Sequence, residues 1–220
     1  RKLETKIPQI IVPDSRAAMS LLAAQFYGNP AKKLKLIAVS GTNGKTTTCH
    51  ILRNILAFAG KKAGVIGTLG VFYGDVFFEP ELTTPDPIRL QKIFRDMADA
   101  GVEYVVMEAS AHAIYLKKLE GLYFAIGIFT NLTQDHLDFF SDMERYKAAK
   151  LRFFHHDFCR YLLVNSDDPA GVEIMNGEKD VLTYGIENPA DVFAIDVEST
   201  SGGNCFVMNL FDRIFEIKSE

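Results

Sequence analysis

Short, continuous runs of apolar residues alternate along the chain with segments whose apolar residues recur every three or four positions. The first pattern is typical of strands buried on both faces, and the second marks one face of a helix. The strand-like runs are 36–39, 63–66, 104–107, 124–129 and 161–164, and the helix-like segments are 45–59, 86–97 and 143–154. Strands that alternate with helices predict an α/β fold, a mostly parallel sheet flanked by helices.

Two regions depart from this alternation. Residues 71–78, with a turn at 73–76, predict a hairpin that protrudes from the sheet, and short alternating segments from Val192 onward predict a small antiparallel extension. The chain begins without methionine and ends inside a strand-like segment, 213–217. We therefore expect it to be a piece of a longer protein.

A glycine-rich loop follows the first predicted strand and leads into the first predicted helix. It reads Gly41-Thr42-Asn43-Gly44-Lys45-Thr46-Thr47, which is the place and composition of a phosphate-binding loop (P-loop). Its glycines let backbone N–H groups approach a polyphosphate, Lys45 can reach the terminal phosphates, and the Thr46 hydroxyl can bind Mg²⁺. Val39 replaces the first glycine of the generic pattern. The loop predicts an ATP-using enzyme, and the alternative is a glycine turn that only joins strand to helix.

Composition limits the partners. The 220 residues include 24 basic and 28 acidic ones, and the net charge of −4 leaves no electrostatic footprint for nucleic acid. No apolar run approaches the roughly 20 residues needed to cross a bilayer. Cys49, Cys159 and Cys205 form no C-x-x-C pair, which favours reduced, structural thiols. We expect a cytoplasmic protein without membrane insertion.

Candidate chemistry gathers where the predicted strands end, because ligands bind at the carboxyl edge of an open parallel sheet. Glu108, Ser110 and His112 follow one strand, and residues 130–131 and 135–138 follow the next. Glu108 is either an oxygen ligand for Mg²⁺ or a charge that favours a helix N-terminus. His136 is either a metal ligand or general base, or a structural histidine.

Lys150 lies on the apolar stripe of the helix predicted at 143–154. It is one turn from Tyr146 and from Phe153 and Phe154, so its side chain is expected to point inward. One interpretation is a lysine whose ammonium reaches solvent along the surface. The other is a desolvated lysine with a lowered pKa and a chemical role.

Five segments, in this order, resemble the motifs of the Mur ligase family, the amide-forming enzymes of peptidoglycan precursor synthesis. They are the loop at 41–47, Thr83-Thr84-Pro85, Glu108-Ala109-Ser110-Ala111-His112, residues 130–138, and Tyr146-Lys147-Ala148-Ala149-Lys150. The form of 83–85 and of 135–138 is most similar to the branch that adds the third amino acid. The resemblance implies the family's central ATP-binding domain over 31–220, with 1–30 as a linker or the remnant of an N-terminal UDP-sugar domain.

The resemblance implies an ATP-dependent amide ligase. ATP would phosphorylate the side-chain carboxylate of D-glutamate in UDP-N-acetylmuramoyl-L-alanyl-D-glutamate. The amine of a diamino acid, L-lysine or meso-diaminopimelate, would then displace phosphate from the acyl phosphate. The family's C-terminal domain, which selects the amino acid, does not match any part of the sequence, so the chain alone is expected to be nearly inactive.

Roles of single residues follow from the same resemblance. Lys45 and two Mg²⁺ ions would stabilise the transferring phosphoryl group. Thr46 and Glu108 would bind one Mg²⁺, and His136 with Lys150 would bind the other. Lys150 would first be carbamylated by CO₂, which turns a cation into an anionic oxygen ligand.

Substrate contacts are implied less completely. Thr83, Thr84 and Ser110 match positions that contact the muramoyl dipeptide. The glutamine and arginine expected further along fall on Leu116 and Lys118, and of these Lys118 is retained as a substrate-binding candidate.

Two other functions remain open at this point. A folylpolyglutamate synthase-like ligase has a similar loop, but typically has glycine where Thr46 stands and lacks the Thr-Thr-Pro motif. A nucleotide-binding module without turnover would not need Lys45, Glu108, His136 and Lys150 together.

Overall fold

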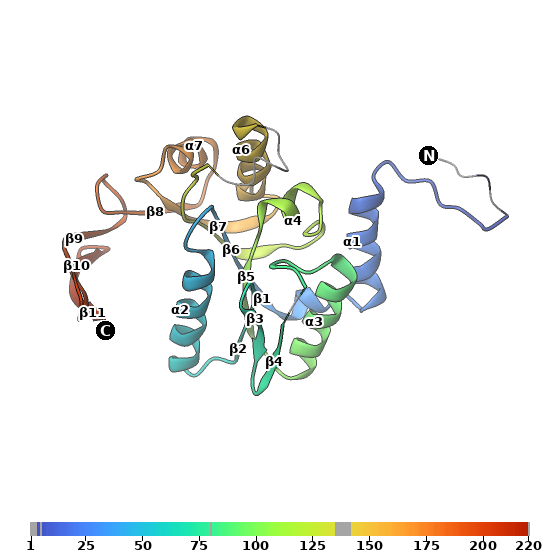
Figure 1. Ribbon diagram of the computed structural model, residues 1–220, viewed down its shortest axis with the longest axis horizontal. Helices are drawn as coiled ribbons and strands as arrows, with labels where there is room; N and C mark the ends of the chain where they lie inside the picture. Colours follow the sequence, from blue (N-terminus) through green and yellow to red (C-terminus); the bar gives the residue numbers. More distant parts are fainter. Residues whose placement is uncertain (1–3, 5, 80, 135–141, 220) are drawn as a thin grey trace.

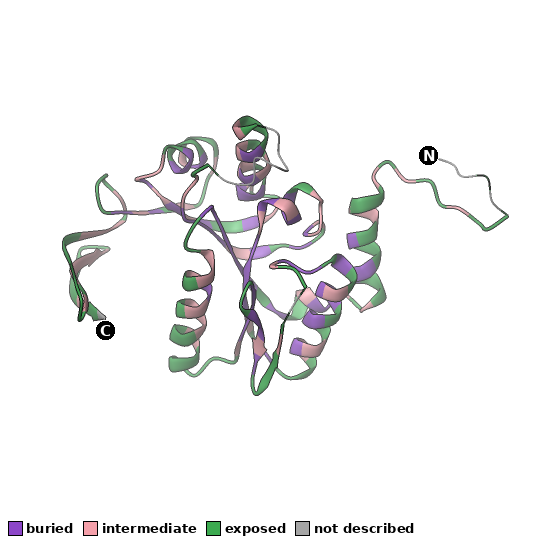
Figure 2. Cartoon of the chain, viewed as in Figure 1, coloured by how far each residue is buried: buried purple, intermediate pink, exposed green. Residues whose placement is uncertain are grey.

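The computed structural model describes residue 4 and residues 6–79, 81–134 and 142–219. Within them the strands form one 11-stranded sheet in the order β11-β10-β9-β8-β7-β6-β1-β5-β2-β3-β4, and helices lie against it (Figure 1). The strands at its centre are the most deeply buried part of the molecule (Figure 2). The predicted α/β fold is confirmed.

Six neighbouring strands make the parallel part of the sheet. They are β1 (Lys35–Ser40), β2 (Ala63–Gly67), β5 (Tyr104–Glu108), β6 (Phe124–Phe129), β7 (Cys159–Asn165) and β8 (Val181–Gly185). β1 lies between β5 and β6, with Val39 in register with both Glu108 and Ile128. Three strands therefore end side by side where the glycine-rich loop begins.

Antiparallel strands extend both edges of the sheet. The hairpin of β3 (Gly70–Tyr73) and β4 (Val76–Phe78) adds to β2. The three strands β9 (Val192–Thr200), β10 (Gly203–Leu210) and β11 (Arg213–Ser219) add to β8 through a short parallel pairing of Tyr184 and Gly185 with Val192 and Phe193. Both predicted extensions are confirmed.

Helices cover both faces of the parallel strands. They are α1 (Ser15–Phe26), α2 (Lys45–Phe58), α3 (Pro87–Asp99), α4 (Ala111–Tyr115), α6 (Met143–Leu151) and α7 (Pro169–Gly177), with short 3-10 helices η1 (Pro30–Lys33) and η2 (Arg152–Phe154). Ile37 and Val39 pack with Cys49 of α2 on one face, whereas Leu36 and Ala38 belong to the larger core under α3, η2 and α7. Alternate residues of one strand thus serve two cores.

Residues 1–30, expected as a linker or the remnant of an N-terminal domain, include helix α1. Asp14 caps this helix by accepting from the backbone N–H groups of Arg16 and Ala17, and its carboxylate pairs with Lys117 at 2.7 Å. The Ser20 hydroxyl donates to the carbonyl of Lys117 at 2.8 Å. These contacts fix α1 to the body of the domain, against the loop that follows α4.

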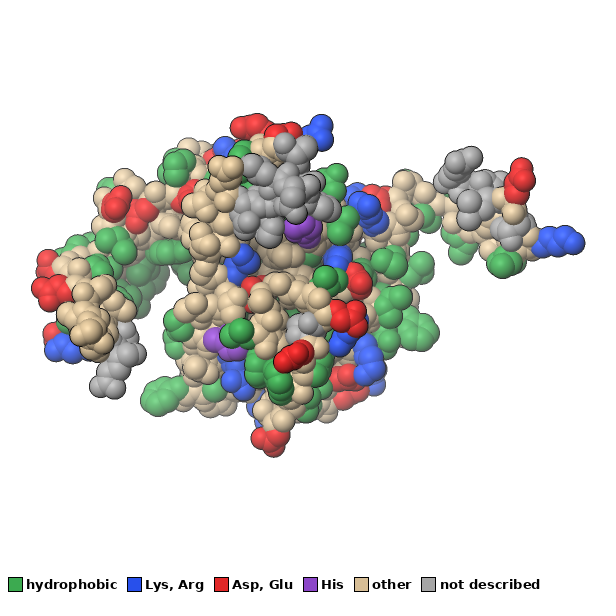
Figure 3. Space-filling view, in the orientation of Figure 1, with side chains coloured by type: hydrophobic (Ala, Val, Ile, Leu, Met, Phe, Trp, Pro, Cys, Tyr) green, Lys and Arg blue, Asp and Glu red, His purple; other side chains and the backbone are tan. Residues whose placement is uncertain are grey.

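The described residues contain no helix that is both long and apolar enough to cross a bilayer. On the face of the molecule in Figure 3, acidic and basic side chains are interspersed, in keeping with the small net charge.

Candidate functional site

The glycine-rich loop has the shape that a phosphate-binding loop requires. Gly41 has a φ of +148° and Gly44 a φ of +84°, which residues with a side chain rarely adopt. A Cβ on Gly41 would lie 2.0 Å from Oγ1 of Thr130. Lys45 begins α2, so the loop ends at a helix N-terminus, where backbone N–H groups favour an anion.

Lys45 folds back over this loop. Its Nζ donates to the carbonyl of Gly41 at 3.0 Å and to that of Thr42 at 2.7 Å. The ammonium is therefore held at the mouth of the loop, beside the N–H groups that would surround a phosphate. This position agrees with the contact to terminal phosphates expected from the sequence.

The segment after β6 braces the loop from the other side. The backbone N–H of Thr42 donates to the carbonyl of Asn131 at 2.8 Å, and that of Asn43 donates to its side-chain oxygen at 2.9 Å. The Thr130 hydroxyl donates to the carbonyl of Asn43 at 2.7 Å. Sequence analysis placed 130–131 at this edge, and the structure gives them a bracing role.

Glu108 is the last residue of β5 and only 1% exposed. Its Oε1 accepts from the Thr46 hydroxyl at 2.9 Å and from the backbone N–H of Thr68 at 2.8 Å, and its Oε2 accepts from the Thr68 hydroxyl at 3.2 Å. A Cβ on Gly67 would lie 2.3 Å from Oε1. The residue that caps α4 with its side chain is Ser110, not Glu108. The helix-charge interpretation of Glu108 is therefore not needed.

Thr68 was missed in the sequence. Its signal was present, because it follows β2 directly and so lies at the same carboxyl edge as the predicted residues. Without a charge or a motif it gave no reason to be selected.

Lys150 points inward, as the apolar stripe predicts. It is 1% exposed, and its Nζ lies 4.7 Å from the centre of the Tyr146 ring, which is itself fully buried. The Tyr146 hydroxyl is 3.1 Å from Oγ1 of Thr42. A lysine that reaches solvent along the surface is excluded by this burial.

A hollow of about 400 Å³ joins these groups at one edge of the sheet. Its lining consists of 41–47, Thr68, Thr83, Glu108, Ser110, Ala111 and Lys150. Thr84 is buried just behind: its hydroxyl donates to the carbonyl of Glu108 at 2.8 Å and to Oγ of Ser110 at 3.1 Å. Two oxygen donors, Thr46 and Glu108, lie together beside the loop, and this donor set fits a hard cation such as Mg²⁺.

Among the described residues, Lys118 is not brought into this lining. Lys118 pairs with Asp86 at 2.7 Å, and Asp86 occupies the N-cap position of α3 without making a capping hydrogen bond. His136, with the rest of 135–141, lies outside the described residues.

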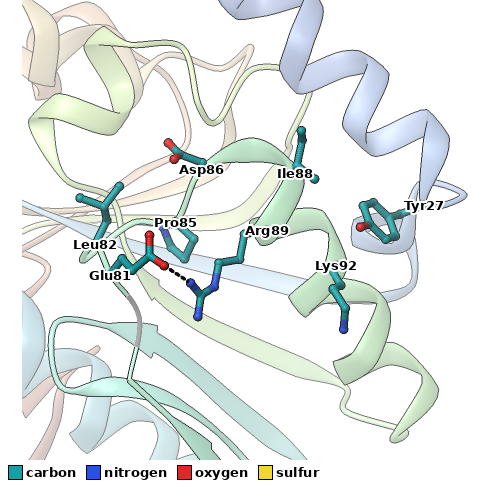
Figure 4. A pocket seen from close by; sticks show the side chains of 8 residues that line it. All are labelled: Tyr27, Glu81, Leu82, Pro85, Asp86, Ile88, Arg89 and Lys92. Carbon is teal, nitrogen blue, oxygen red and sulfur yellow. Dashed lines mark hydrogen bonds and ion pairs between the residues drawn. The ribbon is translucent and has the colours of Figure 1, made fainter.

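A second hollow of about 400 Å³ has Pro85 of the Thr-Thr-Pro segment in its lining (Figure 4). Its lining comes from α1's C-terminal side, from residues before α3 and from α3 itself: Tyr27, Glu81, Leu82, Pro85, Asp86, Ile88, Arg89 and Lys92. Arg89 reaches Glu81 at 3.1 Å across this hollow. The Thr-Thr-Pro segment thus contributes Thr83 to the first hollow and Pro85 to the second.

The cysteines play no part in the site. In the described residues all three are free, and Cys49 and Cys159 are buried. Burial, and then the charge of Glu108, raises the pKa of the Cys49 thiol. The interpretation of structural thiols is confirmed.

Comparison with known proteins places this geometry in a family. Residues 39–220 match the model of the Mur ligase middle domain. The chain belongs to the Mur ligase family. The curated relatives of this Mur ligase include the UDP-N-acetylmuramoyl-L-alanyl-D-glutamate--2,6-diaminopimelate ligase of Geobacillus thermodenitrificans, 44% identical over 94% of this chain and 44% of the relative. A second, the ligase 1 of that name from Clostridium acetobutylicum, is 42% identical over 93% of this chain and 43% of the relative.

Solved structures agree with this assignment. A structure of a UDP-N-acetylmuramoyl-L-alanyl-D-glutamate--2,6-diaminopimelate ligase superposes with a TM-score of 0.88 at 28% identity, over 100% of this Mur ligase and 46% of that chain. A folylpolyglutamate synthase of Mycobacterium tuberculosis in complex with ADP superposes with a TM-score of 0.72 at 13% identity, over 92% of this chain and 53% of the other, and shows a shared fold alone. This Mur ligase thus spans less than half the length of the curated relatives it matches.

Proposed function

We propose that this chain is the ATP-using part of a ligase that joins diaminopimelate to UDP-N-acetylmuramoyl-L-alanyl-D-glutamate in peptidoglycan precursor synthesis. One observation carries the proposal: a glycine-rich loop, the buried Glu108 and the buried Lys150 line a single hollow. The names of the relatives favour diaminopimelate over L-lysine as the added amino acid. We assign the reaction to the cytoplasm, where ATP and UDP-linked precursors are available.

The loop residues would bind the phosphates of ATP. Backbone N–H groups at the start of α2 and the ammonium of Lys45 point at the place where negative charge grows during phosphoryl transfer. Thr42, Asn43 and Thr47 line the same hollow. Their bracing by residues 130–131 keeps the donors in place before the substrate arrives, which lowers the cost of reorganisation.

Thr46 and Glu108 would hold one Mg²⁺. When bound, the ion would neutralise phosphate charge and orient the γ-phosphate toward the attacking carboxylate. The present hydrogen bond of 2.9 Å between these side chains brings two oxygen donors together, and the bonds from Thr68 aim the carboxylate. His136 remains a proposed ligand of a second Mg²⁺.

Lys150 would join that second site as a carbamate. Its ammonium would first lose a proton, and the neutral amine would then add to the carbon of CO₂ and release a second proton, so that a cation becomes an anionic oxygen donor. Burial favours the neutral amine that this reaction needs, because an ammonium at 1% exposure has lost most of its hydration, and the bound Mg²⁺ would offset the charge of the carbamate.

The dipeptide substrate would lie across Thr83, Thr84 and Ser110. Thr83 and Ser110 line the ATP hollow, so the D-glutamate carboxylate would meet the γ-phosphate there. Lys118 would contribute from the side of Asp86 and the second hollow. The amine of diaminopimelate would then displace phosphate and form the amide bond.

Neither alternative function accounts for the site as well. A folylpolyglutamate synthase-like ligase shares the fold, but the Thr46–Glu108 contact depends on the threonine that such ligases typically lack. A module without turnover would have no use for a buried lysine and a buried carboxylate that line the same hollow.

The test is ADP release by the full-length parent enzyme with Mg²⁺-ATP and the muramoyl dipeptide, with meso-diaminopimelate or L-lysine added separately. We expect release only with diaminopimelate, and a loss of at least about 100-fold in Lys45→Ala, since the lysine stabilises transition-state charge. Lys61→Ala, an exposed lysine after α2, is the matched control. Normal turnover by Lys45→Ala would overturn the role of the loop, and release with neither amino acid would overturn the substrate assignment.

A further inference from the structure

Two histidines and a glutamate meet at the edge of the sheet opposite the ATP hollow. His155 and His156 precede β7, and Glu178 lies between α7 and β8. Both strands are parallel to β1, so these residues lie at the amino edge, whereas the P-loop lies at the carboxyl edge. We propose that His155, His156 and Glu178 form a binding site for a divalent transition-metal ion of the zinc type, separate from the Mg²⁺ chemistry.

The spacing of the three side chains suits one ion. One ligand atom from each residue lies within 4.8 Å of the others. His155 Nε2 is 3.7 Å from Oε1 of Glu178, and His156 Nδ1 is 3.7 Å from its Oε2. Two ligands of a tetrahedral zinc ion stand about 3.3 Å apart, given metal–ligand bonds near 2.0–2.1 Å. Small rotations of the side chains would therefore complete the site, with water as the fourth ligand.

The carboxylate of Asp157 lies near the ring nitrogen of each histidine that would not bind the metal. Its Oδ2 is 3.1 Å from His155 Nδ1, and its Oδ1 is 3.5 Å from His156 Nε2. The backbone N–H of Asp157 donates to His155 Nδ1 at 3.3 Å, whereas a metal ion on Nε2 calls for the form in which Nδ1 carries the proton and donates it to the Asp157 carboxylate instead. That form leaves Nε2 able to bind a metal, as in carboxylate–histidine–zinc arrangements.

Glu178 is held in a fixed direction. It is the residue that ends α7, its side chain is 14% exposed, and its Oε2 accepts from the backbone N–H of His156 at 3.3 Å. When both imidazoles are neutral, the carboxylates of Asp157 and Glu178 give the cluster a negative charge. The neighbouring Arg152 is paired instead with Glu120, at 3.5 Å. Charge and ligand type together favour Zn²⁺ or Ni²⁺ over Mg²⁺, which prefers oxygen.

The ion would act as a clip rather than in catalysis. It would connect the start of β7 to the connection between α7 and β8, two segments that otherwise meet only through side chains and the sheet. The hollow beside the cluster, about 450 Å³ and lined in part by His155, Asp157 and Glu178, leaves the fourth position open to solvent. Binding to the folded state alone raises the melting temperature.

The experiment is calorimetric titration of the 220-residue chain with ZnCl₂ in excess MgCl₂, together with thermal unfolding with and without Zn²⁺. We expect one site whose affinity falls by about 10–100-fold in Asp157→Asn and is lost in His155→Gln, His156→Gln or Glu178→Gln. The Zn²⁺-dependent rise in melting temperature should disappear in the same variants. Glu187→Gln, at an exposed glutamate outside the cluster, is the control and should bind as the parent does.

Two results would overturn the proposal. The first is the absence of Zn²⁺ binding by the parent chain, which would leave the cluster as histidine–carboxylate ion pairs. The second is Zn²⁺ binding that all three ligand variants retain, which would place the ion elsewhere. Circular dichroism at 25 °C checks that each variant is folded. If a ligand variant does not fold, the milder Asp157→Asn variant still tests the site.

Discussion

Burying the amine of Lys150 removes a charged group from water, which carries a high cost in free energy. An ammonium without water needs compensation, and the Tyr146 ring at 4.7 Å supplies only part of it. The helical stripe in the sequence predicted that this lysine points inward, since its neighbours at one-turn spacing are aromatic. The stripe could not predict how close Tyr146 and Thr42 come, because that contact joins segments about a hundred residues apart.

The carbamate at Lys150 gives a prediction with a chemical rescue. In the full-length parent, Lys150→Ala should lower ADP release by at least about 100-fold, because the ligand of a charge-stabilising ion is lost. Added acetate or another small carboxylate should restore part of the activity by filling the cavity with an oxygen donor. Lys147→Ala is the matched control, on the same helix but paired with Glu173 at the surface. Full activity of Lys150→Ala would remove the carbamate from the proposal.

At the scale of elements, close packing decides where α7 lies. A Cβ on Gly171 would stand 1.9 Å from the carbonyl oxygen of Asn165 at the end of β7, so the helix can approach the strand only because this residue has no side chain. Asp168 caps the helix and also accepts from the backbone N–H of Leu132 at 2.8 Å. The position of α7 therefore bears on the segment that braces the P-loop.

Gly171→Ala tests this packing. We expect it to lower the free energy of unfolding by about 1–3 kcal/mol, because the helix must move away from β7. Gly177→Ala, in the same helix with nothing within 4 Å of the added Cβ, should be neutral or stabilising by up to about 1 kcal/mol. Urea unfolding of both variants measures the difference, and equal stabilities would refute the close approach.

Elements with strong local patterns could be predicted from the sequence, and the others could not. The central strands are continuous apolar runs, and α3 has Pro87 at its start with a clear apolar face, so both were found. Residues 15–26 and 169–177 lack such a signal, since α1 is rich in small residues and α7 is short. β8 was missed because the burial of its residues depends on its pairing with β7, and the sequence alone does not show that pairing. Thr68 was missed for another reason: it follows a predicted strand, but it carries no charge and belongs to no motif.

For the molecule as a whole, several carboxylates are better stabilised in the folded state than in the unfolded chain. The side-chain bond from Lys117, followed by the backbone bond from Ala17, lowers the pKa of Asp14 to about 2. Backbone and hydroxyl bonds from Thr183 lower the pKa of Asp191, which ties β8 to the start of β9. Between the two pKa values the unfolded chain binds more protons, so stability falls on acidification.

Acid unfolding therefore has a defined window. The contribution of Asp14 should be fully present above the ordinary carboxyl value near 3.8 and lost as the pH falls toward about 2, and that of Asp191 should fall in the same direction below 3.8. Asp191→Asn should weaken the fold at pH 7 and reduce the drop in unfolding free energy between pH 7 and pH 2.5. Asp75→Asn, on the exposed turn between β3 and β4, is the control. Urea unfolding across that pH range measures both, and an unchanged slope in Asp191→Asn would contradict the assignment.

Glu108 limits how this protein can vary. One residue serves the P-loop through Thr46, the end of β2 through Thr68 and the Thr-Thr-Pro segment through its carbonyl and Thr84. Aspartate would be one methylene too short to reach both threonines, and any side chain on Gly67 would displace the carboxylate. No neighbour can therefore change alone without cost to another. The residues at this edge of the sheet are therefore constrained together. Substitutions are expected to be tolerated more easily on surfaces where no single residue joins several segments.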